Sequence, residues 1–265
     1  MAPVQLERLR PQINAIASQF GNSDLFIKSL VSLLNIYSSE IDISSSQITP
    51  YSLIPKLNVP QVVLNQLEIS FNHLVPSYPA QAKEIAENLW GKIFLEYKKI
   101  ALHISSNLPP NEINWYYGKI EQWIDNDTER PIIDVVLNIA KKSQVMITNE
   151  KWVALIEKWI HAKNNRLKKV GLLALSDLIA LGSFQNLPVI FHIIEPIISK
   201  PSVAINSDLM HITKALAEKS ESETAAFIIH LITLNPAPEL FSFIRKCLPF
   251  FMEINASEIK KRLPQ

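Results

Sequence analysis

The sequence predicts an all-α protein folded as a right-handed α-solenoid, a superhelix of stacked helical hairpins that forms one domain over residues 1–265. Nearly every segment carries apolar residues at the 3–4 spacing of a helix, and none requires the period of two that marks a strand. Only 5 glycines occur, too few for a hairpin-rich β protein. A short pattern also recurs at the distance expected of helical repeats.

Turn and capping residues delimit the expected helices along the chain. Leu6 to Phe20 carries one apolar stripe, and Ser23 or Asp24 can cap a second helix that runs to about Tyr37. Residues 41–55 are serine-rich and predict a loop. Pro60 lies near the first position of the next helix, where its missing N–H costs nothing. Further helix starts are predicted near Pro79, Pro109, Thr128, Asn149, Asn164, Asn186, Asn206, Ser220 and Pro236.

The recurring pattern is Ile-Glu-Gln-Trp-Ile at 120–124 and Ile-Glu-Lys-Trp-Ile at 156–160, 36 residues later. A repeat of this length that holds two helices is typical of an α-solenoid, in which each hairpin buries its apolar face against its neighbours. The alternative is two amphipathic helices with similar faces by chance.

Charge is balanced overall but unevenly distributed. The 26 basic and 25 acidic residues give a net charge of +1, so no global field indicates a nucleic acid or a membrane. Residues 141–169, however, hold 8 basic and 2 acidic residues. This cluster predicts phosphate binding, the alternative being a solvated face with no partner.

No catalytic motif or cofactor site is evident. The scattered glycines exclude a phosphate-binding loop, and the histidines lack metal-ligand spacing, so neither a cofactor nor a metal is expected. The single Cys247 is predicted to be buried and fits a reducing cytoplasm. No signal peptide or membrane span is expected. The five tryptophans are predicted to be mostly core, with one exposed for stacking on a base or sugar.

Three stretches resemble the DNA alkylation repair family of HEAT-like repeat proteins, which includes the bacterial alkylpurine DNA glycosylases of the AlkD/AlkC type. They are Val59–Leu64, Ile85–Ala101 and Trp159–Leu172, and the likeness extends over about residues 55–250. The resemblance implies a HEAT-like solenoid with a concave basic groove. Such enzymes excise cationic alkylpurines with a carboxylate that stabilises the oxocarbenium-like sugar.

Carried over by position, the resemblance makes Asp134 the catalytic carboxylate and Lys168 and Lys169 the phosphate-binding pair. Two positions depart from the family, because Arg130 and Lys214 stand where it has aromatic residues. Asp134 has a structural alternative, either as an early helix residue favoured by the helix dipole or as a partner of Arg130 four residues away. The expected DNA-binding residues are Arg130, Lys163, Arg166, Lys168, Lys169 and Lys214.

Two functions follow as expectations. The first is a monomeric, cytoplasmic protein that binds double-stranded DNA and retains weak or altered base excision. The second is a non-enzymatic α-solenoid that binds a protein or recognises nucleic acid structure through the same basic cluster.

Overall fold

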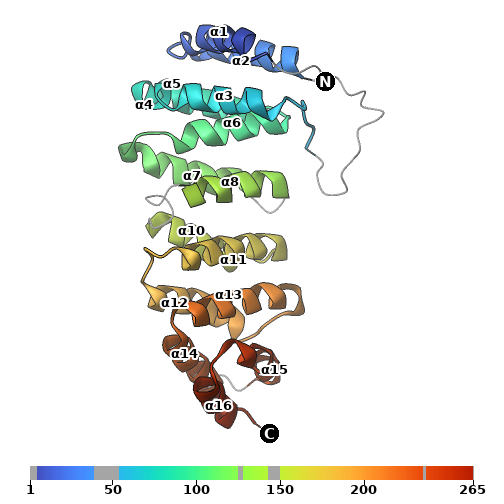
Figure 1. Ribbon diagram of the computed structural model, residues 1–265, viewed down its shortest axis with the longest axis vertical. Helices are drawn as coiled ribbons and strands as arrows, with labels where there is room; N and C mark the ends of the chain where they lie inside the picture. The colour runs from blue at the N-terminus through green and yellow to red at the C-terminus, as the bar shows by residue number, and fades with distance from the viewer. Residues whose placement is uncertain (1–4, 39–53, 125–127, 143–149, 235–236, 265) are drawn as a thin grey trace. The chain divides into compact units, whose positions relative to one another are not determined.

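The computed structural model describes residues 5–38, 54–124, 128–142, 150–234 and 237–264, and these ranges contain helices and no strand. The all-α prediction is therefore confirmed for this part of the chain. The chain divides into two compact units, residues 1–142 and 143–265. Figure 1 shows the helices of each.

The first unit stacks its helices in two layers. One layer holds α1, α3, α6 and α8, in which each helix packs on the next. The other holds α2, α5 and α7, where α2 packs on α5 and an ion pair between Lys119 and Glu87 joins α7 to α5. The elements are α1 (Leu6–Ala17), α2 (Ser23–Tyr37), α3 (Gln61–Phe71), α4 (Leu74–Ser77), α5 (Pro79–Trp90), α6 (Leu95–Ser106), the 3-10 turn η1 (Pro110–Glu112), α7 (Ile113–Trp123) and α8 (Arg130–Lys142).

The second unit repeats this two-layer plan. One layer holds α11, α13 and α15, and the other holds α10, α12, α14 and α16. Phe191 of α12 stacks on Phe227 of α14 with ring centroids 4.6 Å apart. The elements are α10 (Glu150–Ile160), α11 (Asn165–Ala180), α12 (Leu187–Ile198), η2 (Val203–Ile205), α13 (Asn206–Lys219), α14 (Glu221–Leu234), α15 (Pro238–Cys247), η3 (Leu248–Phe250) and α16 (Glu253–Arg262).

Helix starts largely follow the predicted signals. Asn164 caps α11, and α5 begins at Pro79 as expected. Asn22, rather than Ser23 or Asp24, caps α2, because its side-chain oxygen accepts from the Leu25 N–H at 3.1 Å. The start predicted near Thr128 falls two residues later, at Arg130. Asn149, Pro236 and most of the 41–55 loop lie outside the described residues.

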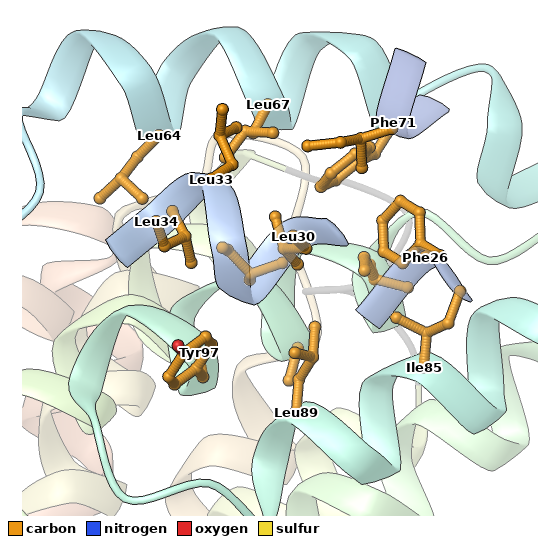
Figure 2. Close-up of a cluster of buried hydrophobic side chains, with 14 of the residues drawn as sticks. Phe26, Leu30, Leu33, Leu34, Leu64, Leu67, Phe71, Ile85, Leu89 and Tyr97 are labelled. Carbon is orange, nitrogen blue, oxygen red and sulfur yellow. The ribbon is translucent and has the colours of Figure 1, made fainter. Parts of the chain in front are cut away.

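The core of the first unit lies between its two layers. Figure 2 shows leucine and phenylalanine side chains of α2 meeting those of α3 and α5, with Tyr97 of α6 beside them. Phe20, Phe26 and Phe71 form a cluster in which the Phe20 and Phe26 rings meet edge to face at 4.9 Å. Such burial of amphipathic faces supplies most of the stability of short helices.

A buried carboxylate fixes the chain that leads into α3. Glu96 is 6% exposed and accepts the backbone N–H of Leu57 at 2.9 Å and that of Asn58 at 3.1 Å. Asn58 adopts a left-handed φ of 55°, which asparagine tolerates better than most residues. The carboxylate therefore holds a strained turn in place, a role that the sequence did not indicate.

Helices α10 and α11 of the second unit approach each other closely at Gly171. A Cβ placed on Gly171 of α11 would lie 2.7 Å from Cγ1 and 2.8 Å from the backbone N of Ile160 at the end of α10. Glycine is needed here because any side chain would hold the two backbones apart. Trp152 and Trp159 of α10 are buried and meet edge to face at 5.6 Å.

The two copies of the sequence repeat occupy equivalent places. Residues 120–123 end α7 and Ile124 follows it, residues 156–160 end α10, and the isoleucines at both ends of each copy are buried. The shared pattern thus marks the same C-terminal helix turn in the two units.

None of the described helices is both long enough and apolar enough to cross a membrane.

Candidate nucleic-acid interface

Four cationic side chains gather at the beginning of α11. Lys163 precedes the helix, and Arg166, Lys168 and Lys169 lie in its first two turns. Lys163, Arg166 and Lys169 are exposed, while Lys168 is half-buried. Within the described ranges, no carboxylate forms an ion pair with any of the four. We call these four residues the α11 basic cluster.

A side-chain cap defines the start of α11. The Asn164 side-chain oxygen accepts the backbone N–H of Arg166 at 2.7 Å, which caps the helix. Capping residues of this kind fix the direction in which the chain enters the helix. Arg166, Lys168 and Lys169 therefore project from the first turns of the helix, and Lys163 lies directly before the cap.

Lys214 lies on α13, the helix that packs beside α11. A second lysine of α13, Lys219, shows which way α13 runs relative to α11. Lys219 Nζ donates to the carbonyl oxygens of Ile179 at 2.9 Å and Leu181 at 2.8 Å, so the C-terminal ends of α11 and α13 are adjacent. The two helices pack together and therefore run parallel.

The alignment of α11 and α13 along their lengths places Lys214 close to the α11 basic cluster. Lys214 lies five residues before Lys219, level with about residue 175 of α11, so Lys169 is roughly 9 Å away along the axis at 1.5 Å per residue. With an interaxial distance of about 9 Å, the two Cα atoms are roughly 13 Å apart. Lys214 is exposed and pairs with Glu218 at 3.7 Å, an exposed i,i+4 ion pair that is readily exchanged.

The proposed catalytic residue belongs to the other unit. Asp134 lies on α8, is half-buried and interacts with another group. The side chain of Arg130 lies outside the described part of the chain, so the expected pair with Asp134 stays a prediction. The structure thus gathers five of the predicted DNA-binding residues in the second unit, with Asp134 and Arg130 in the first.

The helices that carry these cations supply no stacking aromatic side chain of their own. The sequences of α11 and α13 contain neither phenylalanine nor tyrosine nor tryptophan. The departure at Lys214 therefore leaves α13 without the aromatic residue that the resemblance implied.

The tryptophans follow the prediction only in part, because two of the five are buried, three are half-buried and none is exposed. Trp152 and Trp159 are buried, whereas Trp90, Trp115 and Trp123 are half-buried. Trp90 and Trp123 stack with centroids 4.5 Å apart and planes 11° apart. Each ends its helix, which is the sequence signal that could have revealed the pair.

Lysines surround this half-buried aromatic group. Lys98 Nζ donates to the Trp90 carbonyl oxygen at 2.7 Å and lies 4.5 Å from the Trp90 ring centroid, and burial lowers the pKa of Lys98. Lys83 and Lys119 approach Trp115, and each forms an ion pair with a glutamate, Glu112 and Glu87 respectively. Each of these lysines is thus bound to a group of the same unit. The lysines and tryptophans together connect α5, α6 and α7.

Other titratable groups show no catalytic arrangement. Cys247 is fully buried as predicted, and burial raises the pKa of its thiol to about 12, which suppresses the nucleophilic thiolate. His103 Nε2 contacts the Glu68 carbonyl oxygen at 3.1 Å and the Asn72 side-chain oxygen at 2.9 Å, so it ties α6 to α3. Among the described residues, no group of three or more His, Cys, Asp or Glu is placed to hold a metal ion.

No protein-family model matches the chain, and no curated protein or solved structure is detectably similar to it. Function must therefore be argued from the chemistry of this surface together with the motif resemblance.

Proposed function

We propose that this chain binds the phosphate backbone of double-stranded DNA through α11 and α13, as a HEAT-like helical repeat protein related in architecture to the alkylpurine DNA glycosylases. The observation that supports this most strongly is the α11 basic cluster. It presents four cations on one ordered helix start, with no carboxylate partner among the described residues. A polyanion gains from such a surface because it releases counterions on binding.

The composition of the surface favours backbone contacts over base reading. Of its five cations, four are lysines, which act as flexible point charges. Arg166 alone could form a bidentate contact with guanine, and no aromatic residue of these helices can stack on a base. Binding should therefore depend little on sequence and strongly on salt.

The finer architecture belongs to the same proposal. We infer that the two-layer plan of each unit continues as a right-handed α-solenoid through the chain. Small-angle scattering tests this, since a compact globule of 265 residues has a radius of gyration of about 18 Å. A solenoid requires a distinctly larger value, and a measured radius near 18 Å would exclude it.

Binding is tested by titrating a labelled duplex at several salt concentrations. The logarithm of the association constant should fall linearly with the logarithm of salt, with a slope of about −3 to −5 for four or five phosphates. Lys168→Glu with Lys169→Glu should make the slope shallower by about 2. Lys28→Glu with Lys56→Glu, two exposed substitutions in the first unit, matches the change in net charge and should change the slope little. A wild-type slope near zero removes nucleic acid as the ligand.

Base excision is the second part of the proposal. The resemblance assigns the carboxylate role to Asp134, and its half-buried place on α8 is compatible with contact to a substrate. Release of 7-methylguanine from alkylated duplex should be detectable and should disappear in Asp134→Asn. An unchanged rate in that variant would make Asp134 a structural residue.

The remaining alternative is a non-enzymatic scaffold. It is favoured if duplex binding is salt-dependent but no alkylated base is released, or if the basic cluster binds an acidic protein while duplex DNA does not compete. We expect a monomer, because a single chain supplies all the cations invoked.

A further inference from the structure

The α11 basic cluster and Lys214 do not exhaust the exposed cations of their layer. Helix α15 packs against α13 in that layer and ends with Arg245 and Lys246, both exposed. Arg245 donates to the Pro264 carbonyl oxygen at 2.6 Å, which holds the chain after α16 against α15. Lys246 has no ion-pair or hydrogen-bond partner within the described ranges.

A buried contact fixes where α15 meets α13. The Thr213 side chain is near enough to Cys247 to lower the pKa of its thiol, and both residues are almost fully buried. Lys246 and Lys214 are the chain neighbours of these two residues. The two lysines therefore flank the same point of the α13–α15 contact, roughly 10 Å apart given normal helix spacing.

Consecutive exposed cations thus lie on three adjacent helices. Lys169 on α11 and Lys214 on α13 are roughly 13 Å apart, and Lys246 on α15 follows after roughly 10 Å. The three lysines cross the helices rather than running along one of them. Each of the three side chains is exposed.

We propose that Lys169, Lys214 and Lys246 form one basic stripe that engages a continuous polyanion lying across α11, α13 and α15. This inference rests on the proposed DNA binding and deepens it, because it specifies an extended ligand rather than an isolated phosphate. Successive phosphates of one B-DNA strand are about 3.4 Å apart along the axis. A stripe of about 23 Å therefore spans about seven phosphates of a strand.

Lys246 provides the discriminating test, because the α11 basic cluster alone gives no role to α15. The salt dependence of binding to a labelled duplex of about 20 base pairs is compared for wild type, Lys169→Glu, Lys246→Glu and the charge control Lys28→Glu. Lys246→Glu should make the slope shallower by about 1, as Lys169→Glu does, and should weaken binding roughly eightfold or more at 0.1 M salt. Lys246→Gln adds no carboxylate to the helix end and should also make the slope shallower and weaken binding.

The outcomes separate the two proposals. If Lys246→Glu and Lys246→Gln both match Lys28→Glu while Lys169→Glu reduces the slope, the stripe is wrong and the α11 site stands. If the wild type shows no salt-dependent binding to the duplex, both proposals fail. If inorganic phosphate at low millimolar concentration displaces the duplex as effectively as an unlabelled duplex does, the ligand is a single phosphate and the stripe is refuted.

Discussion

Gly171→Ala should destabilise the protein even though alanine is the better helix former. In an exposed helix interior, this change would stabilise by about 1 kcal/mol. At Gly171 the new Cβ would lie 2.7 and 2.8 Å from two atoms of Ile160 and 3.1 Å from the Ile156 carbonyl oxygen. The last two distances join it to backbone atoms, which cannot rotate away.

The size of the effect follows from the shift needed to relieve these contacts. Carbon atoms pack comfortably only beyond about 3.5 Å, so α10 would have to move by roughly 0.7 Å. A gap of that size forfeits about a quarter to a half of the dispersion attraction between facing side chains, and one inserted methyl group typically costs about 1–3 kcal/mol. After the propensity gain of about 1 kcal/mol is subtracted, we expect a net loss of up to about 2 kcal/mol.

Urea unfolding followed by circular dichroism measures this loss. Gly118→Ala is a matched control, because Gly118 also lies inside a helix but has no atom within 4 Å of a built Cβ. That variant should gain up to about 1 kcal/mol. If Gly171→Ala proved as stable as wild type or more so, the close approach of α10 and α11 would be refuted.

Three further substitutions test other contacts. Lys219→Met should lower the free energy of unfolding by about 1–2 kcal/mol, because two helix-end carbonyls lose a charged donor, whereas the exposed Lys214→Met on the same helix should cost little. Glu96→Gln should cost about 1–3 kcal/mol, because the amide has one oxygen for two backbone N–H donors; an effect no larger than that of the exposed Glu7→Gln would contradict this role. Tyr116→Phe should stabilise by about 1 kcal/mol, because the buried hydroxyl finds no hydrogen-bond partner within the described ranges. Burial raises the pKa of Tyr116, so its contribution is complete below the unfolded pKa of about 10 and declines above it, and Tyr116→Phe should unfold less readily in alkaline urea titrations than wild type.

Local sequence signals predicted the helical class and several helix starts. Asn164 before an apolar stripe indicated a cap, and the structure places its side chain on the Arg166 N–H. Pro79 marked the first residue of α5. These signals succeed because capping and proline geometry act within one turn of the chain.

Contacts between distant residues were not predictable from local pattern. The start of α6 after Trp90 was missed, because Phe94 precedes the helix without any side-chain cap. Lys219 reads as an ordinary charged residue at the end of a helix, yet it binds carbonyls 38 and 40 residues away. Packing, rather than local propensity, determines such roles.

The candidate site was predictable in part for the same reason. The charge run near Asn164 is local, so the sequence identified Lys163, Arg166, Lys168 and Lys169 as a group. The proximity of Lys214 depends on the register that Lys219 sets between α11 and α13, which no spacing in the sequence encodes. Lys246 was overlooked because its proposed relation to Lys214 depends on the packing of α15 on α13, which no spacing in the sequence encodes.

The two tryptophan pairs give each unit its own optical reporter. Trp90 and Trp123 lie face to face, an arrangement whose coupled transitions produce exciton circular dichroism, while Trp152 and Trp159 meet at nearly right angles in a dry environment. Replacing Trp152 and Trp159 with phenylalanine leaves Trp90, Trp115 and Trp123 to follow the melting of the first unit, and replacing those three leaves the second pair to follow its own half of the chain. The cooperativity between the halves can then be measured in the intact protein without an added dye.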